Sequence, residues 1–365
     1  MFERLAEADK NKVVYLTILL NFQFTVPKNL NTKKYWLRSV CLSVVIILVV
    51  GGITRLTGSG LSMVDWRPVA GILPPITDHQ WNNVFMMYQE SPEYQKVNKG
   101  MSLDDFKFIF FWEYLHRILG RIVGLLCLVP YLWFLFRGKL SGNLKLKGLC
   151  LNILVISQGL MGWYMVKSGL VNVPEVSHYR LAAHLSLAFS VFGLAWWMLL
   201  DLDKKLDSKN NKNAVFFRPW AIGFLLLLCA QIAYGAFVSG MDAGKIYNSW
   251  PLMGDTYFPN DNNFRNLFKL SVFSDPSLVQ FIHRNIAYLI GLFYLLIFYK
   301  VYSNRLFELY KSINILGLTI ILQIILGIFT VIYSAQIYIA SLHQISSIVL
   351  VSSCIYFLHI NTKFN

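Results

Sequence analysis

The sequence predicts an all-α membrane protein with eight transmembrane helices, arranged as two tandem four-helix bundles. Three observations lead to this fold class. Hydrophobic residues make up 56% of the 365 residues and charged residues only 14%, against about 25% charged residues in a typical soluble domain. Eight apolar runs are long enough to cross a bilayer, which takes about 20 helical residues. The second half of the chain also repeats the histidine-bearing motifs of the first.

The eight predicted spans follow one another along the chain, separated by polar or glycine-rich segments. Their expected ranges are 35–53, 108–136, 144–167, 181–200, 217–238, 279–302, 313–333 and 339–359. A shorter apolar segment, 13–26, is a candidate ninth span. Because it is short and carries Asn21 and Gln23, we expect it to lie at the membrane interface instead. Because each half has an even number of spans, the halves share one orientation and are related by a pseudo-twofold axis along the membrane normal.

Basic residues are distributed unevenly between the two sides of the predicted membrane. With the N-terminus inside, the inner segments carry 19 Lys and Arg residues and the outer loops carry 9. The positive-inside rule therefore predicts that both termini are cytoplasmic. The net charge of +14 is explained by this orientation, and we expect no nucleic-acid partner. The expected parts are a cytoplasmic segment 1–34, an N-terminal half 35–200, an inner linker 201–218 and a C-terminal half 219–360.

Four histidines lie at one depth, several residues inside the outer ends of their predicted helices. They are His116, His184, His283 and His343. The stretch "EYLHRILG" (113–120) matches "QFIHRNIA" (280–287), so the first and third histidines correspond. Ionisable residues inside a membrane are functional candidates, although a single histidine there is more often a packing residue.

Two imidazoles from facing helices, present twice, are typical of heme ligation. Zinc needs three or four ligands, and the sequence has no thiolate cluster suited to copper. A heme takes two axial imidazoles and fills an apolar cleft in a four-helix bundle. We therefore expect one heme between His116 and His184, and a second between His283 and His343.

Heme propionates need basic or amide donors. Arg117 and Arg284 directly follow two of the histidines, and Arg55 lies near the outer end of the first span. Gln158 and Gln323 occupy equivalent places in the repeat and are candidate cofactor-binding amides. The alternative for each arginine is a side chain that faces solvent or lipid head groups.

The two halves differ at the residue three places before the repeated histidine. Glu113 stands before His116, whereas Gln280 stands before His283. An acid beside one heme and an amide beside the other predicts that the first site carries out chemistry and the second holds a cofactor. The alternative is that Glu113 only neutralises Arg117, four residues further along the helix.

These motifs resemble the heme A synthase family, over about residues 35–360. The stretches that carry the resemblance are "GGITRLTGSGLSMVDWRPVAGILPP" (51–75), "FKFIFFWEYLHRILGR" (106–121), "YRLAAHLSLA" (179–188), "FIHRNIAY" (281–288) and "SLHQ" (341–344). The resemblance implies an oxidoreductase that converts the C8 methyl group of heme O to a formyl group, giving heme A for terminal oxidases. It also implies heme b as cofactor at His283 and His343, substrate heme at His116 and His184, and Glu113 as a catalytic residue.

One branch of that family has a cysteine pair in the first outer loop, and residues 54–107 contain no cysteine. The expected partners are heme O, the lipid bilayer and, as candidates, a heme O synthase, an electron acceptor and a second copy of the chain. The expected location is the bacterial inner membrane, with the mitochondrial inner membrane as the alternative. A di-heme b cytochrome for electron transfer is the leading alternative function, and a duplicated transporter is a weaker one.

Overall fold

The computed structural model describes residues 32–64, 72–169, 176–203 and 217–362. Helices dominate this part of the chain, and its β-structure is one isolated bridge between Met253 and Thr256. The predicted interfacial segment 13–26 and most of the linker 201–218 lie outside the described residues. The all-α fold class is confirmed.

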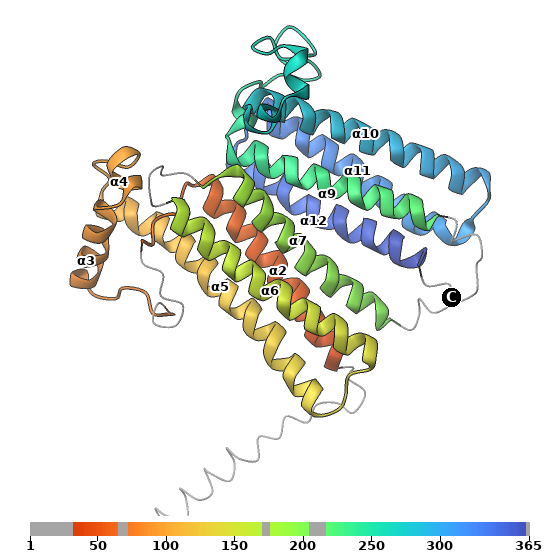
Figure 1. Cartoon of the computed structure of the whole chain (residues 1–365), viewed down its shortest axis with the longest axis horizontal. Coiled ribbons are helices and arrows are strands. Elements are labelled where there is room, and N and C mark those ends of the chain that lie inside the picture. The colour runs from red at the N-terminus through yellow and green to blue at the C-terminus, as the bar shows by residue number, and fades with distance from the viewer. Residues whose placement is uncertain (1–31, 65–71, 170–175, 204–216, 363–365) are drawn as a thin grey trace, which may run out of the picture. The chain divides into compact units, whose positions relative to one another are not determined.

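Within the described residues, eight helices are long and apolar enough to span a membrane, as predicted from the sequence. The first half contributes α2 (Thr32–Leu56), α5 (Leu103–Phe136), α6 (Gly142–Gly169) and α7 (His178–Asp201). The second half contributes α9 (Arg218–Gly240), α10 (Pro276–Ser303), α11 (Phe307–Ile332) and α12 (Ile337–Ile360). Figure 1 shows these two groups of four.

Several helices begin earlier than the apolar pattern predicts, because polar first turns are helical too. Helix α5 starts at Leu103, where the Ser102 hydroxyl accepts a hydrogen bond from the Asp105 backbone N–H. Asp104 and Asp105 in the first turn are favourable for the helix dipole. Helix α10 starts at Pro276 in the same manner, with Asp275 as its N-cap. Hydropathy alone underestimates such ends, which project beyond the membrane core.

The two halves meet along α7, α9 and α12. Helix α7 packs against α6 in its own half and against α9 and α12 in the other. At the C-terminal end of α7, Asp201 accepts a hydrogen bond from Lys147 of α6 (2.6 Å) and contacts the buried His359 of α12 (3.0 Å). Helix α2 joins this contact from the first half, since the Gln344 amide of α12 donates to the Leu48 carbonyl.

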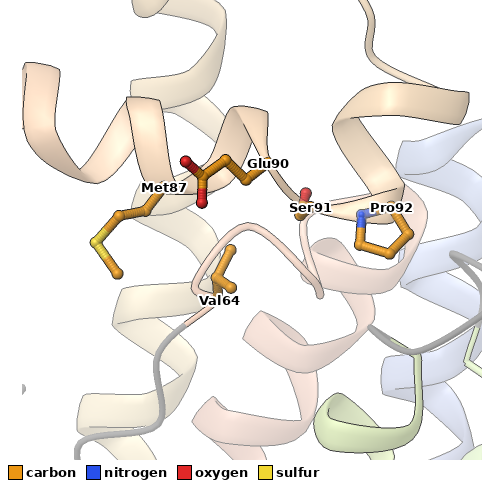
Figure 2. A pocket seen from close by; sticks show the side chains of 5 residues that line it. All are labelled: Val64, Met87, Glu90, Ser91 and Pro92. Carbon is orange, nitrogen blue, oxygen red and sulfur yellow. The ribbon is translucent and has the colours of Figure 1, made fainter.

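A small helical module packs against the start of α5 in the first half, and we call it the outer module after its predicted side of the membrane. It contains α3 (Asp78–Gln89) and α4 (Pro92–Lys96). Tyr88 of α3 packs on Phe106 of α5, with ring centroids 4.9 Å apart. A pocket beside this contact is lined by Val64, Met87, Glu90, Ser91 and Pro92, as Figure 2 shows. The module thereby brings the segment that follows α2 close to the outer end of α5.

Candidate functional site: two histidine pairs

The four predicted histidines lie on four different helices, two in each half of the chain. His116 is on α5 and His184 on α7, while His283 is on α10 and His343 on α12. The ring centroids of His116 and His184 are 6.5 Å apart. Two imidazoles that share one metal ion, each at a metal–nitrogen distance of about 2 Å, have centroids roughly 6 Å apart. The separation of the first pair is therefore compatible with two imidazoles that share one metal ion.

A glycine of a neighbouring helix lies against each imidazole. The contacts are Gly51 with His116, Gly162 with His184, Gly235 with His283 and Gly327 with His343. A Cβ atom at these glycines would lie 2.7, 3.3, 3.2 and 3.0 Å, respectively, from Cε1 of the histidine. Carbon atoms normally approach to about 3.5–4.0 Å, so a side chain at any of the four would displace the ring.

Three of the histidines contact a glutamine through Nε2. The Gln158 amide nitrogen is 3.2 Å from Nε2 of His184, and that of Gln231 is 3.3 Å from Nε2 of His283. Gln323 makes the third such contact, at 3.4 Å from His343. Each glutamine stands four residues before the glycine that touches the same ring. These contacts position the imidazoles when heme is absent, and an amide would give up its contact if the same nitrogen bound a metal.

His116 differs from the other three histidines. The residue four places before Gly51 is Ile47, and its Cδ1 is 3.7 Å from where a Cβ of Gly120 would lie. Among the described residues, no glutamine contact of this kind is present at His116. The Nδ1 atoms of all four histidines are buried, and none has a hydrogen-bond partner in the described part of the chain. Because an unpaired buried polar group costs free energy, the described residues alone do not satisfy these four rings.

Glu113 is buried, and both of its carboxylate oxygens accept hydrogen bonds. Its Oε2 accepts from the Ser62 hydroxyl (2.7 Å) and the Met63 backbone N–H (2.8 Å). Its Oε1 accepts from Nε (3.1 Å) and Nη2 (2.5 Å) of Arg117. Arg117 also donates to the Met63 carbonyl (2.9 Å). The ion pair considered as the alternative role is therefore present, and the same carboxylate fixes the segment after α2.

In the second half, the residue that corresponds to Glu113 donates a hydrogen bond instead of accepting one. The Gln280 amide donates to the Tyr247 carbonyl (2.9 Å). Arg284 donates to the carbonyls of Tyr247 (3.1 Å) and Leu252 (3.2 Å). The Nε atom of Arg284 is buried and has no partner among the described residues. Both arginines thus bind the segment after the first helix of their half, and Arg284 retains a free donor.

Arg55 lies between the two halves. Its Nη2 donates to the carbonyls of Ser239 (2.7 Å) and Gly240 (3.2 Å) at the end of α9, and it pairs with Asp242 (3.4 Å). A cation is favourable at a helix C-terminus, where the last carbonyls lack intrahelical partners. In this structure the Arg55 guanidinium is therefore engaged by the second half of the protein.

The other histidines lie apart from the two pairs. His79 of α3 is exposed and contacts Asn83. The His178 ring makes a tilted contact with Tyr179 and an edge-to-face contact with Phe237 (ring centroids 4.1 and 5.4 Å). His359 lies at the inner end of α12. None of these three contacts a member of either pair through an interaction found in the described residues.

Sequence reasoning missed Gln231 and the glycines that face the rings. Gln231–Gly235 has the same spacing as Gln158–Gly162 and Gln323–Gly327, so a search of every span for Q-x-x-x-G identifies it. In the sequence, "GGITRLTGSGLSMVDWRP" (51–68) aligns loosely with "YGAFVSGMDAGKIYNSWP" (234–251), which pairs Gly52 with Gly235. The contacts with His116 and His283 instead pair Gly51 with Gly235, one residue away.

Comparison with known proteins gives one consistent family. The family model for COX15-CtaA, described as a cytochrome oxidase assembly protein, matches residues 34–355. The chain is 43% identical to a protein of Pelagibacter ubique over 90% of this chain and 96% of that one. It is 42% identical to one from Rickettsia felis (90% and 97% covered) and 41% identical to one from Flavobacterium johnsoniae (89% and 96% covered). All three relatives are named heme A synthase. The chain therefore belongs to the heme A synthase family of cytochrome oxidase assembly proteins.

Proposed function

We propose that this chain, an oxidoreductase of the membrane, converts the C8 methyl group of heme O to a formyl group and releases heme A. The observation that carries this proposal is the combination of two histidine pairs with an acid at only one of them. The relatives named heme A synthase support the same activity. We place the protein in the bacterial inner membrane with both termini cytoplasmic, on the basis of its bacterial relatives and its inner excess of basic residues.

His283 and His343 hold heme b, and His116 and His184 hold the substrate heme. Bound heme supplies the redox chemistry, while the protein supplies ligation, orientation and local charge. The 6.5 Å separation of the first pair and the glycine against each ring support this assignment. In each half the glycines leave the imidazoles room that any larger residue would fill.

Glu113 is the catalytic residue in this proposal. Oxidation of a methyl group releases protons, and a carboxylate within reach of the substrate can accept them. Ser62 and Met63 orient one oxygen of Glu113, and Arg117 compensates its charge. The neutral Gln280 cannot accept a proton in this way, which is consistent with a cofactor role for the second pair.

Arg284 is the stronger of the candidate propionate partners. Its buried Nε atom has no partner among the described residues, so it can donate to a carboxylate without losing a bond. Arg117 is committed to Glu113 and the Met63 carbonyl. Gln158 and Gln323 act on the imidazoles they contact, which makes them positioning residues for the ligands.

The test is to purify the full chain, extract its hemes and identify them chromatographically, before and after incubation with heme O. Heme b together with heme O or heme A supports the proposal. Heme b alone, with no oxidation of added heme O, would assign the chain to the alternative class of di-heme electron-transfer cytochromes. The His116→Ala variant should lose the O- or A-type heme and keep heme b, which separates the two pairs.

A further inference from the structure

Helix α2 has two adjacent glycines, Gly51 and Gly52, which lack side chains. Each of them is contacted by a residue from a different helix. Gly51 faces the imidazole of His116 from α5. Gly52 faces the side-chain amide of Gln344 from α12, and a Cβ atom at Gly52 would overlap that amide. Successive residues of a helix point about 100° apart. The two glycines therefore let side chains from other helices approach the α2 backbone closely from two directions at the same height along the helix. One face serves the first histidine pair and the other receives the second half of the protein.

The amide of Gln344 is held in this position by a hydrogen bond. Its Nε2 donates to the carbonyl of Leu48, at 2.9 Å. Leu48 lies one helical turn before Gly52, so the amide reaches the backbone of α2 beside the glycines. Gln344 directly follows His343 in the sequence. Gln344 is thus the neighbour of His343, a candidate heme ligand of the second half. The same residue contacts α2, the helix that lies against His116 in the first half.

We propose that Gln344 is a positioning residue for the substrate site: it sets α2 against α12 and thereby fixes Gly51 beneath the His116 imidazole. This inference rests on the proposed assignment of His116 and His184 to the substrate heme. Helices in a membrane gain little from hydrophobic attraction to one another, so small residues and interhelical hydrogen bonds determine their approach. Gln344 and Gly52 provide both at one point.

The Gly51 contact makes the substrate ligand sensitive to this position. A Cβ at Gly51 would lie 2.7 Å from Cε1 of His116, the shortest of the four glycine–histidine distances. The ring has no glutamine contact of the kind that holds the other three among the described residues. A shift or rotation of α2 therefore changes the surface that contacts the His116 ring. No glutamine among the described residues would hold this ring in place as α2 moves.

The experiment uses the full purified chain loaded with heme, and it reads the low-spin ferric signals of the two hemes by electron paramagnetic resonance. The signal of the first pair is identified by its loss in His116→Ala, and that of the second by its loss in His283→Ala. In Gln344→Leu we expect the first-pair signal to shift and its heme affinity to fall about five- to thirtyfold, the effect of one lost interhelical hydrogen bond. The second-pair signal should remain.

A second variant approaches the contact from the other side. Gly52→Ala expels the Gln344 amide from its position without altering residue 344, so it should produce the same loss at the first pair. The double variant should be no worse than either single one, because both remove the same interaction. Gly124→Ala, on α5 where nothing lies within 4 Å of the added Cβ, is the matched control and should leave both signals unchanged.

Three results would overturn the inference. A loss confined to the second-pair signal would show that Gln344 serves only its neighbour His343. Additive losses in the double variant would show that the two residues act separately. If the parent chain gave no heme signal that depends on either pair, the ligand assignment itself would fail and the inference with it, and that outcome is visible before any variant of Gln344 is made.

Discussion

Glu113 and Gln280 hold equivalent positions in the two halves, yet their hydrogen bonds run in opposite directions. Glu113 accepts from the Ser62 hydroxyl and the Met63 backbone N–H, whereas Gln280 donates to the Tyr247 carbonyl. In each case the partner belongs to the segment after the first helix of the half. The residue before the repeated histidine therefore anchors an outer segment in both halves, and only the first half does so with an acid.

The Glu113→Gln variant separates anchoring from proton transfer. A glutamine can still accept from Ser62 and the Met63 N–H through its oxygen, so we expect both hemes to remain bound. Conversion of heme O should fall by about 10²–10⁴-fold, the usual contribution of a general acid or base. The measurement is heme content together with heme A formation. Full activity with both hemes bound would restrict Glu113 to an anchoring role, and Gln280→Glu is the reciprocal control.

The glycines against the imidazoles give a prediction specific to each pair. Gly162→Ala should reduce heme binding at His184, and Gly327→Ala should reduce it at His343, because the added Cβ would lie 3.3 and 3.0 Å from the respective ring. The loss should be larger for Gly327→Ala, where the approach is closer. Heme stoichiometry and absorbance of the purified proteins provide the measurement. Gly159→Ala, which meets open space, should behave as the parent.

Gln231 should matter most when heme is absent. Its amide contacts Nε2 of His283 at 3.3 Å, and Gln231→Leu removes this partner from a buried nitrogen. We expect a loss of about 1–3 kcal/mol in the free energy of unfolding of the heme-free protein. With heme bound, the loss should shrink, because in the proposed ligation that nitrogen would bind iron instead of the amide. Thermal unfolding with and without heme measures both effects, and an equal loss in the two states would contradict this role.

Glu93 of the outer module predicts a pH dependence. The pKa of Glu93 is raised from 4.5 to about 7, mainly because the side chain is buried. The hydrogen bond from Tyr88 opposes this shift, and the negative charge of Glu113 adds to it. A raised folded-state pKa favours the protonated acid, so its stabilising contribution is complete below about pH 4.5 and is lost as the pH rises through about 7. The total is on the order of 3 kcal/mol.

Glu93→Gln should remove that part of the pH dependence. The parent should lose stability between about pH 5 and 8, as followed by proteolysis of the outer module, while the variant stays nearly constant over that range. Glu90→Gln, at a neighbouring exposed residue, is the matched control and should retain the parent profile. A parent with a flat profile over this range would show that Glu93 is not protonated by burial.

Much of the fold follows from local sequence. The eight spans are determined by the length of their apolar runs, since a lipid environment requires each backbone group to be satisfied within a helix. The sequence also identifies His116 and His283 as counterparts, because the [EQ]-x-x-H-R frame is contained in one helix and its spacing is fixed by the helical period. Glu113 and Arg117 pair for the same reason.

The contacts that complete each site depend on residues from different helices. Gly51 meets His116, Gln231 meets His283 and Gln344 meets Leu48 only because α2, α9 and α12 are rotated and shifted to particular positions against their neighbours. Helical periodicity shows which residues share one face of a helix. It does not show how far two neighbouring helices are shifted along their axes relative to each other. The sequence alone thus determined the spans, their number and the four ligand candidates. Tertiary packing decided which glycine, amide or backbone carbonyl lies against each of them.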